Sequence, residues 1–434
     1  MEKSSEISGF YRLPIEARRK ILREWADLTD TELAAYDFPP GIDPGIFDRM
    51  IENVVGSYAY PLGIATNFRI NHRDYLVPMA IEEPSVVAAA SNAAKVARAE
   101  GGFSAQTTAS IMIGQVQILD APDPAAGRLR ILAAREALLE KANAQDPMLV
   151  KFGGGARDLE VRVLPSPRGT MLVVHLLVDA RDAAGMNAVN TMCEALAPEL
   201  GRLAGGRSLL RIISNLAVYR LARASATFRA DLLATETMKG SEVVEAILDA
   251  YTLAAVDPFR CATHNKGIMN GISAVVVATG NDFRAIESGA HTYAAFQAKE
   301  GGVVKPLTTY EKDRSGNLVG SIEIPVAVGL IGGATAVHPT AKANVKLLGV
   351  KGAAELAQVL ASVGLAQNFA ALRALATEGI QRGHMELHAR NIAATAGARP
   401  DEVDRVVARL VAEHRIRIDR AKEIIEELRA SGSR

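Results

Sequence analysis

The first 100 residues have the apolar spacing of helices, interrupted by proline and glycine. This spacing predicts helices over 13–26, 43–56 and 84–100. Pro84 suits the first turn of the last of these helices, because an N–H at that position would have no partner, and Gly101-Gly102 ends it. The helix is rich in alanine, which lets neighbouring backbones approach closely. We expect it to be the central, buried helix of the fold.

From 110 to 216 strand-like and helix-like segments alternate. Their order, β-α-β-β-α followed by a further apolar run, is typical of a ferredoxin-like split βαβ unit. The strand-like segments are 111–119, 159–164, 171–178 and 209–213, and the helices are 127–144 and 186–203. The sequence therefore predicts a small α/β domain over 110–216, inserted into a larger one.

The rest of the chain is predicted to be mainly helical. We expect helices at 217–234 and 241–256, a polar loop at 257–271, a strand at 272–278, a helix at 282–299, a strand at 320–328 and closing helices at 384–396, 400–413 and 416–430. The predicted fold class is α+β. A large helix-rich domain (1–109 and 217–377) surrounds a central helix and carries the inserted domain (110–216), and a three-helix lid (378–434) closes the chain.

Composition narrows the class of protein. The 434 residues include 49 basic and 49 acidic side chains, and this balance disfavours a nucleic acid as the main partner. Two cysteines, Cys193 and Cys261, make a disulfide framework implausible and indicate a reducing compartment. The N-terminus does not resemble a signal peptide, and the apolar runs at 171–178 and 272–279 are too short to span a bilayer. We expect a soluble, cytoplasmic protein without a membrane partner.

Two segments of the large domain could carry chemistry. The first is Glu82-Glu83-Pro84-Ser85, where a carboxylate could cap a helix or act as a proton donor, and adjacency does not say which glutamate points inward. The second runs from Arg260 to Gly271. Its Lys266 could stabilise an oxyanion and its Arg260 could bind a carboxylate. Cys261 near His264 also raises the hypothesis of a thiol nucleophile, although a buried cysteine is more often a small apolar residue.

Three further segments are candidates, each with a plain structural alternative. Asp282, after Gly280, could be a helix cap or could orient Lys266. The junction at 178–187 could bring helix N–H groups to a dinucleotide phosphate, and since no GxGxxG stands between a strand and a helix, such binding would not be of the Rossmann type. Asp146 could accept two ribose hydroxyls and repel a 2′-phosphate, although a turn residue before proline is the simpler interpretation.

His384 opens a helix of the predicted lid and could act as a general acid that arrives on closure. The histidines form no HExxH pattern, and His384 and His388 lack a third ligand nearby. The sequence therefore predicts no metal site.

Taken together, these strings resemble 3-hydroxy-3-methylglutaryl-coenzyme A (HMG-CoA) reductases from residue 52 to about 390. Each match is weak alone, but all of them occur in the order of the family. They are Glu52-Asn53-Val54-Val55-Gly56, PMAIEEPSVVAAAS at 78–91, DAAGMN at 182–187, Asn265-Lys266-Gly267, ATGNDFR at 278–284, Gly332-Gly333-Ala334-Thr335 and Gly383-His384-Met385. The residues of the string at 78–91 and the short N-terminus are similar to those of the class II, prokaryotic branch. The serine that serves phosphorylation control in the eukaryotic branch is missing after His384.

The resemblance implies roles that spacing does not supply. Glu83, rather than Glu82, aligns with a glutamate that exchanges protons with the substrate oxygen, and Lys266 would stabilise that oxygen. Asp282 would tune both groups, and His384 would protonate the departing coenzyme A thiolate. The implied substrate contacts are Ser85, Asn215, Arg260 and Asn270, and the implied cofactor contacts are Asp182, Ala183, Gly185, Met186 and Asn187, with Asp146 as the residue that would favour NAD.

The resemblance also implies a reaction and an assembly. Reduction of a thioester to an alcohol takes two hydrides from two NAD(P)H, through a hemithioacetal and an aldehyde. Coenzyme A is the co-substrate, NAD is expected over NADP, and NAD-preferring members often act in mevalonate breakdown. The family's active site lies between two subunits, so a homodimer, and further a trimer of dimers, is implied. Two alternatives stay open: a Cys261-dependent acyl-CoA transferase and a non-catalytic acyl-CoA-binding homologue.

Overall fold

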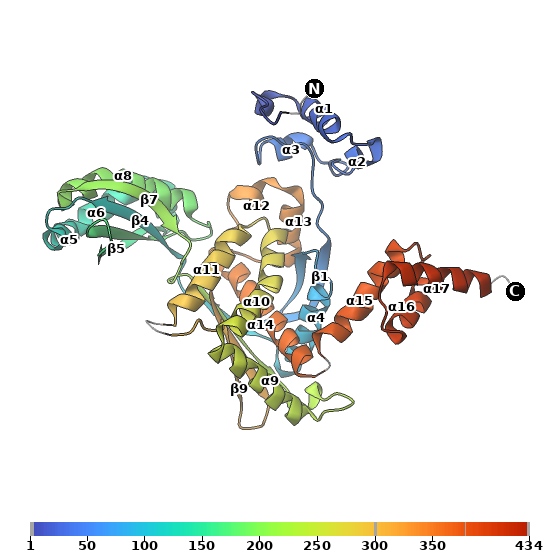
Figure 1. Ribbon diagram of the computed structural model, residues 1–434. Coiled ribbons are helices and arrows are strands. Elements are labelled where there is room, and N and C mark those ends of the chain that lie inside the picture. The colour runs from blue at the N-terminus through green and yellow to red at the C-terminus, as the bar shows by residue number, and fades with distance from the viewer. Residues whose placement is uncertain (1–3, 299–301, 378, 432–434) are drawn as a thin grey trace.

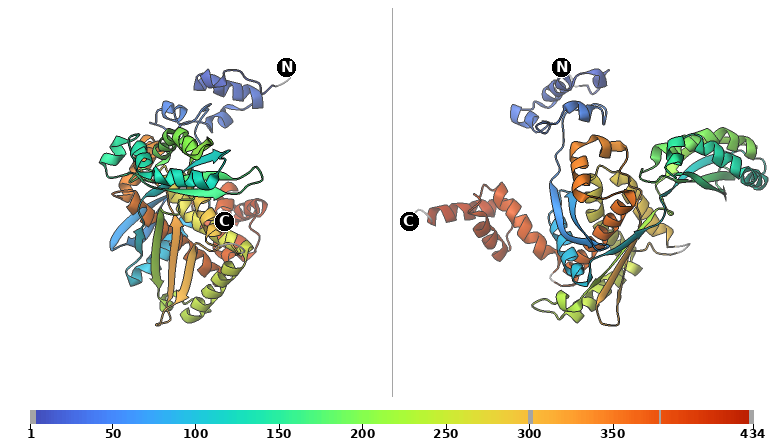
Figure 2. Two further views of the ribbon diagram at one scale, coloured as in Figure 1. Left: turned by 90° about the vertical axis from the view of Figure 1, so that its left-hand side faces the viewer. Right: turned by 180° about the vertical axis from the view of Figure 1, so that it is seen from behind.

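Three smaller parts project from a central body (Figures 1 and 2). The computed structural model describes residues 4–298, 302–377 and 379–431. We call the parts the N-terminal arm (4–61), the central body (62–109 and 215–377), the small lobe (110–214) and the C-terminal unit (379–431). The central body, the small lobe and the C-terminal unit each have a hydrophobic cluster of their own. The predicted α+β fold with an inserted α/β part and three closing helices is confirmed.

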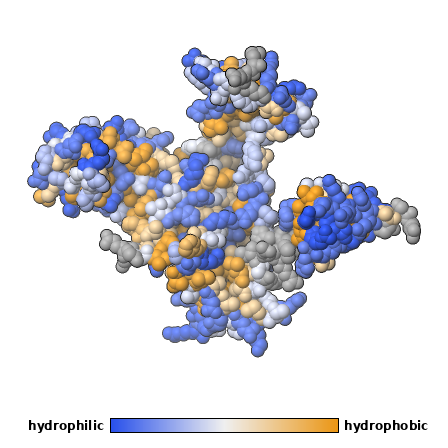
Figure 3. Space-filling model, in the orientation of Figure 1, coloured by the Kyte–Doolittle hydropathy of each residue, from blue (hydrophilic) through white to orange (hydrophobic). Residues whose placement is uncertain are grey.

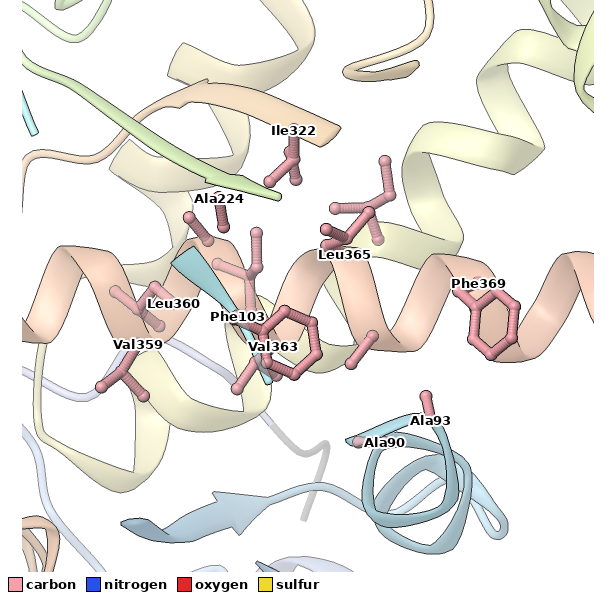
Figure 4. Close-up of a cluster of buried hydrophobic side chains, with 14 of the residues drawn as sticks. Ala90, Ala93, Phe103, Ala224, Ile322, Val359, Leu360, Val363, Leu365 and Phe369 are labelled. Carbon is pink, nitrogen blue, oxygen red and sulfur yellow. The ribbon is translucent and has the colours of Figure 1, made fainter. Parts of the chain in front are cut away.

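The central helix of the body is α14 (Ala353–Ala376), not the predicted helix at 84–100. It packs against α4 (Val86–Ala97), α10 (Pro258–Ala278) and β8 (Leu221–Phe228). In Figure 4, Phe369 of α14 lies toward Ala93 of α4, and Leu365 lies near Ile322 of the sheet. By length and composition α14 could cross a membrane, but 67% of its most apolar window is buried inside the protein, as in a core helix.

Two antiparallel sheets complete the body. β1 (Leu62–Ile70) pairs with β2 (Arg73–Ala80). The larger sheet has the order β3-β8-β10-β9, with β3 at Ser104–Thr107, β9 at Thr308–Lys312 and β10 at Leu318–Pro325. The expected strand at 320–328 is therefore confirmed, whereas the expected helix at 217–234 is β8 followed by a short 3₁₀ turn, Ala230–Leu233. The remaining helices of the body are α9 (Gly240–Val256), α11 (Phe283–Phe296), α12 (Gly333–Val337) and α13 (Pro339–Leu348).

The prediction of a polar loop at 257–271 and a strand at 272–278 is wrong. Both segments belong to α10, a single helix of 21 residues. Asp257 caps it by accepting from the backbone N–H of Arg260, and Pro258 occupies its first turn. The polar residues are concentrated between Arg260 and Asn270, so that part of the helix resembles a loop in the sequence. The run Val275-Val276-Val277 resembles a strand because it is β-branched.

The small lobe has the predicted ferredoxin-like topology. Its antiparallel sheet has the order β5-β6-β4-β7, in which the third strand lies between the first and the second. The elements are β4 (Ile111–Leu119), α5 (Pro124–Ala133), α6 (Arg135–Asn143), α7 (Pro147–Lys151), β5 (Gly155–Leu164), β6 (Met171–Asp179), α8 (Met186–Ala204) and β7 (Arg207–Ser214). Apolar side chains from one face of the sheet pack under these helices.

The two ends of the chain are helical. The N-terminal arm contains α1 (Ile15–Ala26), α2 (Asp30–Ala34) and α3 (Pro44–Asp48), so the expected helix at 43–56 is much shorter than predicted. The C-terminal unit consists of α15 (Ile380–Thr395), α16 (Val403–Ala412) and α17 (Ile418–Ser431). On the face drawn in Figure 3 the C-terminal unit is mostly hydrophilic. Arg399 and Arg429 both contact the buried Glu402, and these contacts lower the pKa of that carboxyl.

Arg220 joins the central body to the small lobe. Its buried guanidinium donates to the carbonyl oxygens of Ala183, at 3.0 Å, and Val328, at 2.6 Å. Burial lowers the pKa of Arg220 to about 10, although Asp179 and Asp182 act in the opposite direction, so the side chain stays charged at neutral pH. One buried cation thus fixes the segment that leads into α8.

Replacing Arg220 with methionine should lower the free energy of unfolding by about 2–4 kcal/mol, because buried carbonyl groups lose their donor. Urea unfolding measures this change. Arg223→Met is the matched control, since that arginine makes a partly exposed ion pair with Glu323, worth about 1 kcal/mol or less. Equal losses in the two variants would contradict the assigned role of Arg220.

Candidate functional site

A cavity of about 580 Å³ lies between the start of α4, one face of α10 and the C-terminal half of α14. Its walls include Glu83, Ser85, Arg260, Lys266, Asn270 and Arg373. Five of these six are predicted site residues, and three segments distant in sequence bring the six together. The cavity is therefore where the sequence-predicted chemistry of the large domain converges.

A carboxylate, an ammonium group and an amide meet in this cavity. Lys266 Nζ and Asn270 Nδ2 each lie 3.1 Å from Glu83 Oε2. Lys266 and Asn270 are four residues apart, so one face of α10 presents both to the loop before α4. Glu82 is exposed and does not line the cavity. The structure thus distinguishes between the two adjacent glutamates.

The cavity is suited to an anion. Its lining carries three cations, Arg260, Lys266 and Arg373, against a single carboxylate, Glu83. Ser85 sits in the left-handed region at φ 75°, and its buried Oγ has no hydrogen-bond partner among the described residues. Arg373 was missed by the sequence analysis. It is one of only two charged residues in the 24-residue α14, with Glu355, and a cation in so apolar a helix was the signal that could have found it.

Asp282 and Asn215 do not line this cavity. Asp282 follows the C-terminal end of α10, and twelve residues of helix at 1.5 Å each place Ala278 roughly 18 Å along the axis from Lys266. The Asp282 carboxylate caps α11 by accepting from the N–H groups of Arg284 and Ala285. Asn215 is exposed and lies beside Gly289 of α11. Within one chain Asp282 is therefore remote from Lys266, and Asn215 stands outside the cavity.

The predicted dinucleotide junction lies on the same side of the body as Asp282. Asn281 accepts from the N–H of Gly329, and a Cβ at Gly329 would stand 2.4 Å from the backbone nitrogen of Ala184. Gly185 is the residue just before α8 and has φ 91°, and a Cβ there would meet Ala180 at 2.6 Å. The start of α8, with Met186 and Asn187, has no side-chain cap. Small residues and open N–H groups there suit the phosphates of a dinucleotide.

Two acidic residues of the predicted cofactor site act as helix caps. Asp182 accepts from the N–H of Ala353 at 2.8 Å and so caps α14 in the neighbouring body. This cap uses one carboxylate oxygen of Asp182, and the cofactor contact inferred for this residue stays a prediction. Asp146 caps α7 through the N–H of Leu149 at 2.9 Å, as its position before Pro147 suggested. This cap leaves the second carboxylate oxygen of Asp146 available for other contacts.

His384 lies in α15, but its side chain is outside the described residues. Within the described part of the chain, no group of three or more histidine, cysteine, aspartate or glutamate side chains could hold a metal ion.

The geometry disfavours Cys261 as a nucleophile. The thiol is fully buried, and burial raises its pKa. Burial also lowers the pKa of His264 to about 3, and the imidazole Nε2 contacts Thr308 rather than the thiol. A protonated thiol without a base beside it cannot begin acyl transfer.

Iodoacetamide at pH 8 should therefore leave activity nearly intact, with less than about a twofold loss under native conditions, because thiolate reactivity follows pKa and exposure. Mass spectrometry of Cys193 and Cys261 after exposure to the reagent measures the extent of labelling. Stoichiometric labelling of Cys261 together with complete inactivation would restore the transferase alternative.

Comparison with known proteins places the chain in a family. Residues 14–389 match the family model described as hydroxymethylglutaryl-coenzyme A reductase. A 3-hydroxy-3-methylglutaryl-coenzyme A reductase of Archaeoglobus fulgidus is 61% identical over 98% of this chain and 95% of its own length. A probable enzyme of the same name from Borreliella burgdorferi is 34% identical over 79% of this chain and 77% of its own length.

Solved structures agree with this assignment. A class II 3-hydroxy-3-methylglutaryl-CoA reductase from Streptococcus pneumoniae, bound to NADPH in open conformations, has a TM-score of 0.74 at 40% identity and covers 96% of this chain and all of its own. A second structure of the enzyme from that organism has a TM-score of 0.75 at 39% identity over 97% and 99%. The chain belongs to the hydroxymethylglutaryl-coenzyme A reductase family and resembles its class II members.

Proposed function

We propose that this protein interconverts HMG-CoA and mevalonate plus coenzyme A by using a nicotinamide dinucleotide, with NAD preferred, and that it acts in mevalonate breakdown. The observation that carries this proposal is the Glu83–Lys266–Asn270 cluster inside a cavity whose other charges are positive. The cations suit the acyl carboxylate, and the cluster suits the oxygen of the reacting carbonyl.

We assign the binding of the substrate, the stabilisation of charge and the transfer of protons to different side chains of the protein. Arg260 and Ser85 bind the carboxylate of the hydroxymethylglutaryl group at one end of the cavity. Lys266 stabilises the negative charge that develops on the thioester oxygen, and Asn270 holds Glu83, which exchanges a proton with that oxygen. His384 protonates the departing coenzyme A thiolate as the hemithioacetal collapses to the aldehyde. The bound nicotinamide supplies or accepts the hydride. The proposed site for its phosphates is the segment from Ala183 to Asn187, which includes the uncapped start of α8.

The direct test mixes the protein with mevalonate, coenzyme A and NAD and follows NADH absorbance, with NADP in a parallel cuvette. We expect NADH to form in proportion to enzyme. No signal with either nucleotide, in either direction of the reaction, would exclude the reductase activity and leave a non-catalytic acyl-CoA-binding homologue.

The preference for NAD rests on Asp146, since the carboxylate would accept ribose hydroxyls and repel a 2′-phosphate. The pneumococcal relative bound to NADPH shows that class II members can hold the phosphorylated nucleotide. Asp146→Ala should reduce the ratio of kcat/KM for NAD to that for NADP by roughly 10- to 100-fold, the worth of a charge-assisted hydrogen bond. Equal or better use of NADP by the unmodified protein would contradict the proposal.

Two copies of the chain are needed to complete the site, in our proposal. One half-site contains Glu83, Lys266 and Asn270. The other contains the start of α8 together with Asp282, which follows the end of α10, roughly 18 Å along the helix axis from Lys266. In a two-fold dimer, the first half-site of each subunit can meet the second half-site of the other subunit, which creates two identical sites. Such dimers would assemble as a trimer of dimers in the cytoplasm. The proposed domains are 1–109 with 217–377 for substrate and dimerisation, 110–216 for NAD and 378–434 as the flap.

A further inference from the structure

Three buried polar atoms without a hydrogen-bond partner belong to residues that line the cavity. They are Ser85 Oγ, His264 Nδ1 and Gln367 Oε1, and the described residues contain only two more such side-chain atoms. Folded proteins leave few buried polar groups unpaired, so a cluster of three around one cavity calls for a ligand that supplies the missing partners. Ser85 already has a proposed role toward the acyl carboxylate, whereas His264 and Gln367 have none.

The hydrogen bonds of His264 fix what its free nitrogen can do. Thr308 Oγ1 donates to Asn368 Oδ1 at 2.9 Å and so uses its only hydrogen. The imidazole Nε2, 2.6 Å from the same Oγ1, must therefore carry a hydrogen and donate it. Burial keeps the ring neutral, since the pKa of His264 is lowered to about 3. Nδ1 is then a lone-pair acceptor in need of a donor.

The position of His264 on α10 is opposite to that of Lys266. Successive helical residues are about 100° apart, so His264 and Lys266 project to the two sides of Gly267. A Cβ added at Gly267 would meet no atom within 4 Å, which leaves open space above the helix at that point. A ligand lying over Gly267 thus has the ammonium group on one side and the imidazole on the other.

The acyl ligand carries two groups that only accept hydrogen bonds and one group that can donate a hydrogen bond. The carboxylate and the thioester oxygen of the hydroxymethylglutaryl group only accept hydrogen bonds, and the cavity offers them Arg260, Arg373 and Lys266. The tertiary hydroxyl is the one donor in this acyl group. On the basis of the proposed function, we propose that His264 accepts the hydrogen bond of this hydroxyl through Nδ1, after a small shift of the buried wall, and so selects the hydroxylated acyl group. Gln367 Oε1, on α14, is a second unpartnered acceptor among the residues that line the cavity.

The test compares hydroxymethylglutaryl-CoA with 3-methylglutaryl-CoA, which lacks only the hydroxyl. His264→Gln keeps a donor near Thr308 and removes the acceptor at the position of Nδ1, whereas His264→Asn keeps that acceptor and gives up the contact with Thr308. In His264→Gln we expect the preference in kcat/KM for the hydroxylated substrate to fall about 10- to 100-fold, with the deoxy substrate little affected. His264→Asn should retain most of the preference.

A purely structural role would lower kcat/KM for both substrates equally in both variants, and that result would overturn the proposal. Calorimetry on the unmodified protein gives a second measurement that does not depend on the variants folding. Hydroxymethylglutarate should bind about 10-fold or more tightly than 3-methylglutarate, and equal dissociation constants would also overturn the proposal. Failure of the reductase itself would appear differently, as the absence of nicotinamide turnover with any substrate.

Discussion

Replacing Lys266 with methionine is expected to lower kcat about 100- to 1000-fold, corresponding to about 3–4 kcal/mol of lost transition-state stabilisation. The ammonium group is 3.1 Å from Glu83 and is the cation nearest to that carboxylate in the cavity. Negative charge on the substrate oxygen develops only as hydride is transferred, so the loss should fall on kcat more than on KM. Steady-state kinetics in both directions of the reaction measures the effect.

Lys346→Met is the matched control, because Lys346 is an exposed lysine of α13 that does not line the cavity. Its kcat should stay within about twofold of the unmodified value, as expected for a surface substitution. A Lys266→Met variant that keeps full kcat and loses only substrate affinity would show that the ammonium group binds the substrate but does not stabilise the transition state.

The sequence predicted the small lobe better than the central body. The strands of the small lobe have one buried face and lie between clear turn signals. The periodicity of apolar residues and the order of strands and helices along the chain were therefore sufficient to predict its topology. The body depends on contacts between segments distant in sequence. α14 has apolar residues on nearly all sides and therefore lacks the polar stripe that marks a surface helix. In α10, tertiary packing overrides the β-branched run near the C-terminal end.

The sequence predicted the identity of several residues of the candidate site but not how these residues are arranged in space. Motif strings pointed to Glu83, Lys266 and Asn270, and these residues meet. The contact between Asp182 and the start of α14 was not foreseen, because a strand-to-helix junction does not reveal that a helix of another part of the chain begins beside it. His264 was considered only as a partner for Cys261. Its hydrogen-bond partner, Thr308, lies 44 residues later in the chain, and Thr308 in turn donates to Asn368, which lies 104 residues after His264. Local patterns do not reach so far.

The proposed division of the site into two half-sites from different copies of the chain gives the sharpest expected result. Lys266→Met disables the half-site with Glu83, and Asp282→Asn disables the other. Each variant alone should be nearly inactive. In a two-fold dimer containing one copy of each, one of the two sites combines both intact halves and the other combines both damaged halves. Random association of equal amounts should therefore restore about a quarter of the unmodified activity, since half of the dimers are mixed and each mixed dimer has one working site.

The control for the restored activity is a pair of variants that both carry their substitution in the same half-site. Co-expressed Lys266→Met and Glu83→Gln should show no restoration, because every site that they form lacks one of the two residues. Differently tagged copies, purified over both tags, isolate the mixed dimers and should raise the restored activity to about half per dimer. Absence of restoration in dimers shown to be mixed would place Asp282 and Lys266 in the same single-chain site or exclude Asp282 from catalysis. Restoration of activity would require that each site takes Lys266 from one copy of the chain and Asp282 from the other. The reason is that each variant subunit has only one intact half-site to contribute.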